Sequence, residues 1–454
     1  MATERSALVE RYRTVLDGDE SILGESFNKI NNKRIEEITA VVLENTIQSI
    51  KNGEQDIRHQ LTENTSALNT TSVAGWTGVL VKLVRRGIPQ LCAHELVGVQ
   101  PMDGPTGLVF AQYATYANKA APNNVALFGL PDTAYSGFSS DGTDGWDQGT
   151  GVAPDGTGPN PGGPVATDYE LDPFAAAGYT TGTAMDTATG EGCIIPKISL
   201  TIESVTVSAK TRALCTSYSS EVAQDMQRLH GLDAEAELAR EMANELVAEI
   251  NAEIMRTIIR VAKIGAEDTT VPGTFDLAVD SSGRYFEERL RDLVFRIEIE
   301  ANKIAFETYA GKGNVILTTA NVASALSMMG VLSACCDKEE SMDVNAPLSC
   351  YAGMLNGKYK VFVDPYQNQM DYVVVGLKQS DTNAGLYYTP YVPFAVDKGK
   401  ADCNGHTQLF FRSRYGMVSN PFVKNPGTGV KDGETLEPNI NPYYRKFAVR
   451  NLTA

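Results

Sequence analysis

A long apolar stripe between residues 233 and 264 predicts a helix that runs through a whole domain. Apolar side chains recur there every four residues, at Leu238, Met242, Leu246, Ile250, Ile254 and Ile258. This spacing places them on one face of an α-helix. Asp233 is a favourable N-cap, and Gly265 is a natural end. At 1.5 Å per residue, about 30 helical residues span ~45 Å, so we expect a spine that crosses a domain.

The rest of the C-terminal half mixes helices and strands. A second helical pattern covers about 286–309, and a short helix precedes the spine, capped by Ser219 or Ser220 and ended by Gly231. Shorter apolar runs predict a helix at 321–329 and strands at 314–319, 358–364, 371–377 and 409–416. Because the order shows no regular βαβ repeat, the pattern favours the α+β class.

A long segment without cations interrupts the first half of the chain. No Lys or Arg occurs between Lys119 and Lys197, and Gly, Pro, Asp and Thr dominate residues 120–196. Such a composition buries too little apolar surface for a large core, so we expect a surface excursion. Alternating apolar residues predict one strand at about 104–116 and a long strand at 197–212. In the second strand the apolar positions change parity after Ile202, which indicates a bulge or a switch of face.

Residues 1–63 form a separate, highly charged segment. Its apolar stripe predicts an amphipathic helix over about 36–51, formed by Ile38, Val41, Val42, Ile47 and Ile50. We expect this helix to have a face that seeks a partner and the segment to have no core of its own. A stretch rich in Ser, Thr and Asn follows and is typical of a linker.

The overall charge is acidic, with a formal net charge of -17 and a pI near 4.8. Dedicated nucleic-acid readers carry a basic face instead. No apolar run approaches the ~20 residues of a membrane span, and the N-terminus has no signal-peptide core, so we expect no membrane contact. Seven scattered cysteines without a CxxC pair predict free thiols in a reducing cytosol, not a disulfide framework or a zinc site.

No motif predicts an enzyme. The four histidines form no metal-binding pair, and no GxSxG elbow occurs. A partial phosphate-loop pattern at Gly353, Gly357 and Lys358 lacks its first glycine and its metal-binding hydroxyl, so a hairpin turn explains it better. The acidic loop 141–147 lacks the spacing of a calcium loop. We therefore expect no catalytic residue, no cofactor and no metal site.

Five sequence blocks occur in a recognisable order: Leu83 to Ala111, Lys210 to Asn251, Tyr351 to Tyr366, Asn383 to Phe394 and Arg412 to Phe422. In this order they resemble the major capsid (head) protein family of T-even-like tailed bacteriophages. Five collinear blocks are more specific than any single motif. The resemblance implies an α+β, Hong Kong 97-like phage capsid fold and a structural function.

The parts of that fold can be assigned along the chain. The resemblance implies a propeptide-like N-terminal segment (1–63), an N-terminal arm (64–104), an extended loop (105–212) with the Gly/Pro/Asp-rich excursion 120–196, a peripheral domain with the spine helix (213–310), an axial domain (311–400) and a return to the peripheral domain (401–454). T-even head proteins carry an inserted domain before the spine. Here the corresponding stretch is shorter, and we expect a loop in its place.

The family also implies proteolytic maturation. Its prohead protease cuts after Glu in a Leu/Ile-x-Glu pattern, which Leu61 and Glu63 fit. Cleavage there would free Asn64 as the mature N-terminus and remove contacts on the inner face of the shell. The tripeptide at 35–37 fits the same pattern, and the position of Glu63 just before the arm favours the later site.

The implied function is assembly. The resemblance predicts homo-hexameric capsomers that join neighbouring capsomers into a head shell around double-stranded DNA, as part of a virion assembled in the host cytoplasm. Expected partners are vertex and portal proteins, decoration proteins, the scaffold and the prohead protease. Packaged DNA would be contacted non-specifically, and the basic cluster Lys82, Arg85 and Arg86 is the candidate inner-face contact, although a solvated helix face explains it equally well. The alternative is the pentameric vertex protein of the same lineage; an enzyme is a more distant one.

Overall fold

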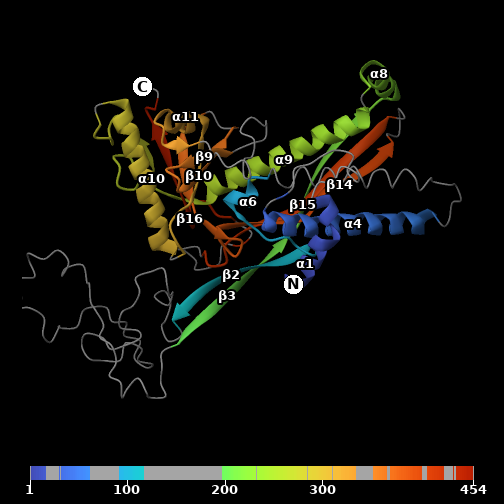
Figure 1. Ribbon diagram of the computed structural model, residues 1–454, viewed down its shortest axis with the longest axis horizontal. Coiled ribbons are helices and arrows are strands. Elements are labelled where there is room, and N and C mark those ends of the chain that lie inside the picture. The colour runs from blue at the N-terminus through green and yellow to red at the C-terminus, as the bar shows by residue number, and fades with distance from the viewer. Residues whose placement is uncertain are drawn as a thin grey trace, which may run out of the picture. The chain divides into compact units, whose positions relative to one another are not determined.

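The computed structural model describes residues 2–16, 30, 32–61, 91–116, 197–231, 233–283, 285–308, 310–333, 351–365, 369–400, 406–423, 433 and 436–452. These residues form a mixed fold of helices and sheets, as the α+β prediction requires (Figure 1). Two compact units divide the chain. The larger comprises Met1–Ala111, Ser204–Glu307 and Lys312–Ala454, and the smaller comprises Gln112–Glu203 and Thr308–Gly311.

The predicted spine is helix α9 (Ala234–Val261). Asp233 caps it, because the backbone N–H of Glu235 donates to Asp233 Oδ1 at 3.1 Å. The C-terminal part of the stripe is at most 1% exposed, at Leu246, Ile250, Ile254 and Ile258. The helix ends earlier than Gly265, since the next three residues form strand β5 (Ala262–Ile264).

The shorter predicted helix is α8 (Ser220–His230). Its N-cap is Ser219, whose Oγ accepts from the backbone N–H of Val222 at 3.3 Å. Gly231 ends the helix with φ at 66°, in the left-handed region that glycine adopts without strain. Both predicted caps are confirmed.

A four-stranded sheet of order β1-β14-β15-β4 lies beside the spine. Its strands are β1 (Gly98–Val99), β14 (Leu386–Lys400), β15 (Thr407–Ser419) and β4 (Lys210–Tyr218). Strand β15 is antiparallel to both neighbours, whereas β1, which follows the short helix α6 (Ala93–Leu96), is parallel to β14. Helix α9 contacts β15 and extends to β16 (Figure 1).

An eight-stranded sheet has the order β5-β16-β11-β7-β10-β9-β8, with β6 paired to β16. Beyond β5, its strands are β6 (Thr274–Asp276), β7 (Val315–Thr319), β8 (Leu332–Ser333), β9 (Tyr351–Leu355), β10 (Tyr359–Asp364), β11 (Tyr372–Gly376) and β16 (Asn441–Arg450). The central strands β7 and β11 are buried at every position. The helices of this region are α10 (Phe286–Thr308) and α11 (Ala320–Met328), so the predicted elements here are confirmed.

The two sheets draw on interleaved parts of the chain. Strands β14 and β15, which come before and after the domain boundary expected at residue 400, share one sheet. Strand β16, near the C-terminus, pairs with β11 of the eight-stranded sheet. A small two-stranded sheet, β12 (Lys378–Ser380) with β13 (Asn383–Ala384), lies between β11 and β14 in sequence. The expected domain boundaries themselves stay a prediction.

Strands β2 (Thr106–Tyr116) and β3 (Ile198–Ser208) pair with each other on either side of the excursion 120–196, which lies outside the described residues. The expected single strand at 197–212 is wrong in one respect. Ala209 interrupts it, donating its N–H to the carbonyl of Pro105 at 2.9 Å, and β4 then pairs with β15. The parity change is a switch of face: Ile202 is exposed and Val207 is buried within one continuous strand.

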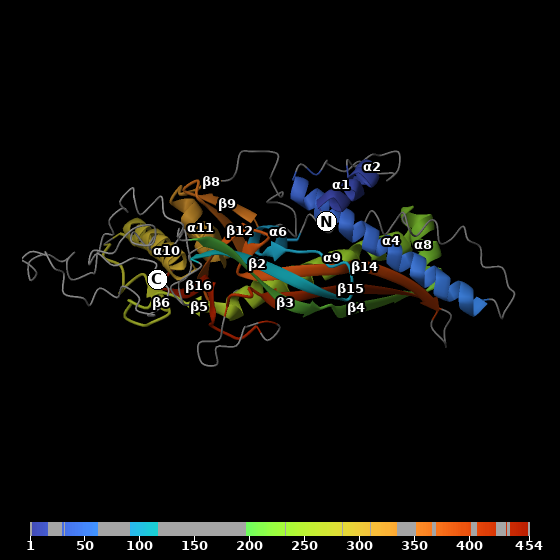
Figure 2. The ribbon, with the colours of Figure 1, turned by 90° about the horizontal axis from the view of Figure 1, so that it is seen from below.

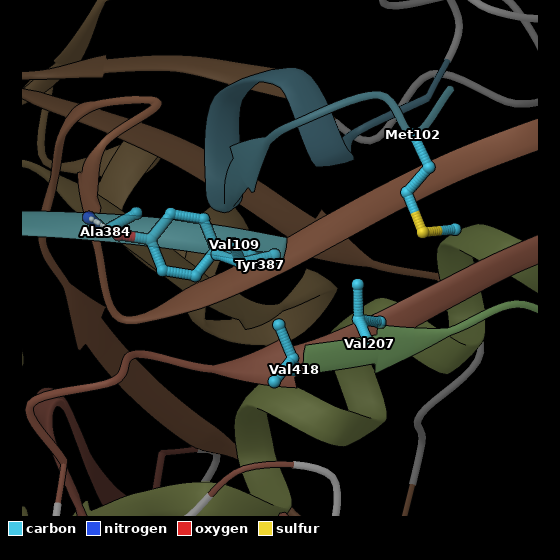
Figure 3. Close-up of a cluster of buried hydrophobic side chains, with 6 residues drawn as sticks. All are labelled: Met102, Val109, Val207, Ala384, Tyr387 and Val418. Atoms are coloured by element: carbon cyan, nitrogen blue, oxygen red, sulfur yellow. Dashed lines mark hydrogen bonds between the residues drawn. The ribbon is translucent and has the colours of Figure 1, made fainter. Parts of the chain in front are cut away.

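A buried apolar cluster joins the near ends of β2 and β3 to the four-stranded sheet (Figure 3). Its members are Met102, Val109, Val207, Ala384, Tyr387 and Val418. These side chains come from the segment before β2 and from strands β2, β3, β13, β14 and β15, so distant parts of the sequence meet in one packed centre.

The N-terminal segment folds into α1 (Ala2–Arg11), α2 (Arg13–Leu16) and α4 (Lys33–Leu61). The expectation that it has no core of its own is wrong. Leu16, Ile30 and Ala40 are buried together, because α1 and α2 fold back against α4 (Figure 2). The predicted apolar face of α4 does find a partner, since this helix packs against β14.

Candidate assembly surfaces

Strand β3 exposes a continuous apolar face. Ile198, Leu200 and Ile202 are 59%, 61% and 60% exposed, and they alternate along the strand with polar residues. On β2, Leu108 and Phe110 are also exposed. Large apolar side chains gathered on one face cost free energy in water, and such a face marks a contact with another protein.

Helix α10 exposes two large aromatic side chains on one face. Phe295 is 66% exposed and Phe306 is 76% exposed. They lie about three helical turns apart, which places them on the same face. The opposite face of the helix is fully buried, at Leu290, Leu293, Ile297, Ala301 and Ile304. The solvent-facing side of the helix therefore carries two exposed phenylalanines among polar side chains such as Arg291 and Asn302.

Within the larger unit, the N-terminal segment is held by both apolar and polar contacts. Ile38, Val41 and Val42 of α4 are buried. The side-chain amide of Asn45 donates to two backbone carbonyls, of Met102 at 2.9 Å and of Tyr391 at 3.2 Å. One residue of α4 thereby bridges the approach to β2 and strand β14.

A buried ionic cluster anchors α10 to β16. Arg445 is fully buried, and its guanidinium donates to Glu300 at 2.7 Å, Glu307 at 2.6 Å and Glu267 at 3.0 Å. Burial acts to lower the pKa of Arg445, but the hydrogen bonds and charges of these carboxylates outweigh it and raise the pKa above its ordinary value. Glu300 also accepts from the backbone N–H of Ala266 at 3.0 Å.

A second ionic cluster links β4 and β15 to the middle of the spine. Arg212 lies 3.2 Å from Glu249 and 2.7 Å from Glu253, and Tyr415 also bonds Glu253. Burial and the neighbouring Glu253 raise the pKa of Tyr415, so its hydroxyl stays protonated. A hollow of about 510 Å³ beside this cluster runs along α9 and is lined by charged side chains of the helix.

The predicted processing and basic residues are only partly placed. Leu61 is the last residue of α4, whereas Glu63, Asn64, Lys82, Arg85 and Arg86 lie outside the described residues. The processing site and the basic cluster therefore both stay predictions.

Other expectations from the sequence concern thiols, metals and membranes. Cys92 and Cys215 are free thiols, the first buried and the second exposed. In the described part of the chain, no group of three or more His, Cys, Asp or Glu side chains is placed to hold a metal ion. None of the helices in that part is long and apolar enough to cross a bilayer.

Sequence reasoning missed the buried Arg445 cluster, although a signal is present. Arg445 lies on the same face of β16 as Tyr443, Phe447 and Val449, at a position where alternation calls for an apolar residue. A lone charge in a buried alternating strand predicts a buried carboxylate partner, since an unpaired charge there is too costly.

Comparisons with known proteins agree with one another. The family model for the major capsid protein Gp23 matches residues 73–449. The major capsid protein of Vibrio phage KVP40 is 31% identical over 98% of this chain and 100% of that protein. The major capsid protein of Enterobacteria phage T4 is 30% identical over 82% of this chain and 81% of that protein. A chain from the solved capsid of Myoviridae phage XM1 aligns with 78% of this chain and 89% of that one, at 7% identity and a TM-score of 0.38.

Proposed function

Because the chain belongs to the Gp23 family of major capsid proteins, we propose that its copies form hexameric capsomers that close into a head shell around double-stranded DNA. Membership confirms the resemblance to T-even head proteins and makes the chain a structural protein of the virion capsid. The proposed architecture is the Hong Kong 97-like fold, with α9 as the spine, β2 and β3 as the base of the extended loop, and the eight-stranded sheet within the axial part.

The exposed apolar face of β3 carries this proposal. Ile198, Leu200 and Ile202 stay open to water in the single chain. A neighbouring copy that covers them removes this apolar area from water, which stabilises the contact by roughly 25 cal/mol for each Å² buried. The same contact repeated around a ring is heterologous, so a closed ring results without a two-fold axis between each pair.

The N-terminal segment fits a role before maturation. It docks through a limited set of contacts, with Asn45 as a polar clasp, and α4 ends at Leu61, two residues before the proposed cleavage point at Glu63. Cleavage there by a prohead protease would release α1, α2 and α4 together. The β14 surface under α4 would then be free for contacts of the mature shell.

Further partners follow from the same proposal. A closed head requires vertex and portal proteins and a scaffold during assembly in the host cytoplasm, and decoration proteins are expected on the outside. The cluster Lys82, Arg85 and Arg86 is the proposed non-specific contact to packaged DNA. The acidic balance of the chain, at -17, leaves most of the DNA charge to counterions.

Electron microscopy of the purified chain tests the proposal. We expect six-fold rings, tubes or closed shells from the wild type, and unassembled protein from Leu200→Asp, because a charge on the β3 face cannot be buried against a neighbour. Thr206→Asp is the matched control, since it adds the same charge to an exposed position of the same strand outside the apolar run.

Each outcome has a defined meaning. Normal assembly of Leu200→Asp would remove the β3 face from the contact, provided that circular dichroism shows both variants folded. Five-fold rings alone would assign the chain to the vertex role. A wild type that stays monomeric across salt and concentration would overturn assembly.

A further inference from the structure

A cavity of about 250 Å³ lies between the start of α4 and one end of strands β7, β9 and β10 of the eight-stranded sheet. Its lining is strongly charged, and the charges come from separate elements of the fold. They are Arg34 of α4, Glu95 of α6, Lys358 and Lys360 at the start of β10, Lys378 of β12, and Asp381 just after it.

Cations outnumber carboxylates in this cavity. Lys360 lies 2.9 Å from Glu95, and Lys378 lies 3.7 Å from Asp381, so both lining carboxylates are already engaged. Lys358 is 3.7 Å from Glu298, a residue of α10 that does not line the cavity. For Arg34, no carboxylate lies within ion-pair distance among the residues that the structure describes.

Arg34 of α4 and the lysines on the opposite side of the cavity repel each other. Burial lowers the pKa of Lys378, and although Asp381 and Glu95 oppose this, the positive charges of Arg34 and Lys360 lower it further. Docking of α4 therefore brings Arg34 toward the cations of the sheet. The N-terminal end of α4 adds its partial positive charge at the same place, where Asn32 Oδ1 accepts from the backbone N–H of Arg34 at 3.1 Å.

We propose that this cavity binds a small polyvalent phosphate anion that bridges α4 to the sheet and holds the N-terminal segment in its docked position. Arginine and lysine are the side chains that recognise phosphate oxygens, the first by paired hydrogen bonds and the second as a point charge. A free anion fits better than a DNA backbone, because α4 forms one wall and a duplex cannot enter while the helix is docked. The site does not depend on the proposed shell geometry.

Titration calorimetry of the full-length chain with inorganic pyrophosphate, below the concentration of assembly, tests the site. We expect saturable binding to the wild type and affinity weaker by at least about tenfold in Arg34→Gln and in Lys358→Gln. Both side chains are exposed, so neither change disturbs the core. Arg291→Gln is the control, since Arg291 is an exposed helical arginine on α10 that pairs only locally with Glu287 among the described residues.

Hydrogen exchange supplies the second measurement. Pyrophosphate should slow amide exchange in α4 of the wild type but not in α4 of Arg34→Gln. If the anion only screened surface charges, amide exchange in the two proteins would respond alike. Absence of binding, or an equal loss in Arg291→Gln, would overturn the proposal. So would a short DNA duplex that binds these residues where pyrophosphate does not, because the cations would then belong to a nucleic-acid surface.

Discussion

Arg445 and Glu300 meet as a fully enclosed ion pair: the Nε of Arg445 donates to Glu300 Oε2 at 2.7 Å, and neither side chain is exposed. The pair fastens α10 to β16. Removing one partner of such a pair leaves a buried charge, which costs about 3–5 kcal/mol. We expect Arg445→Met to lower the free energy of unfolding by this amount, as measured by urea denaturation.

A double variant gives the sharper reading. Arg445→Met with Glu300→Leu removes both charges, but it leaves Arg296, which is 10% exposed, with Asp268 at 3.7 Å and without Glu300 at 3.0 Å. Because Arg445 and Glu300 interact, we expect the double variant to lose less stability than the sum of Arg445→Met and Glu300→Leu measured singly. Lys263→Met is the control: it also pairs with Glu307, at 2.9 Å, but is 40% exposed and should cost at most about 1 kcal/mol. A loss in the double variant equal to that sum would contradict this account.

Glu298 should make the stability of the chain depend on pH. Burial acts to raise the pKa of Glu298, but hydrogen bonds from Lys312 and Tyr359 outweigh it and lower the pKa below its ordinary value of 4.5. The unfolded chain therefore takes up the proton first as the pH falls. The contribution of Glu298 to the free energy of unfolding is complete above its pKa in the unfolded chain. It is lost as the pH drops through its lower pKa in the folded chain.

Urea midpoints measured between about pH 6 and pH 3 check this dependence. We expect the midpoint of Glu298→Gln to fall less over this range than that of the wild type. Glu287→Gln, an exposed change on the same helix, should follow the wild type. If all three curves are parallel, the bonds from Lys312 and Tyr359 do not act on the folded state as described.

Asn45 should govern the release of the N-terminal segment. Asn45→Ala removes two hydrogen bonds, to the carbonyls of Met102 and Tyr391, each contributing about 1 kcal/mol. We expect amide exchange in α4 to become roughly tenfold faster or more. Gln48→Ala is the control, because Gln48 bonds only Glu44 of its own helix among the described residues. Equal exchange in both variants would show that apolar packing alone holds the helix.

Gly385 should tolerate no side chain. A Cβ at this position would lie 2.6 Å from the ring of Tyr444 and would also overlap Tyr443. We expect Gly385→Ala to destabilise the chain by about 1–3 kcal/mol in thermal or urea denaturation, as overpacked cores do. Gly104→Ala is the matched control, since the nearest atom to its added Cβ is 3.7 Å away. A neutral Gly385→Ala would mean that both tyrosines can move aside.

Local signals made much of the fold predictable. The caps at Asp233, Ser219 and Gly231 act on their own helices, so residue type and spacing suffice to place the ends. The change of face after Ile202 could be recognised from parity alone. The pairing of β14 with β15 and of β16 with β11 could not, because the hydrogen bonds of a sheet join residues that no local rule connects.

The candidate sites, too, could be predicted from local sequence only in part. A lone arginine in the alternating strand β16 hints at a buried partner, but Glu300 lies 145 residues away and on a helix, and nothing in the strand selects it. The cavity around Lys378 gathers charges from four elements, so only tertiary structure brings them together. The small core of the N-terminal segment was missed because its apolar residues are spread over α1, α2, the segment before α4 and α4 itself.

The hydrogen bond between Asn45 and Tyr391 can form only late during synthesis. The two residues are 346 positions apart. At about 5–20 residues per second, the ribosome needs roughly 20–70 s to make the chain between them. For that time the apolar face of α4 has no strand β14 to pack against. Helix α4 is therefore made well before the strand it packs against, and the nascent chain needs protection of this helix until β14 has been synthesised.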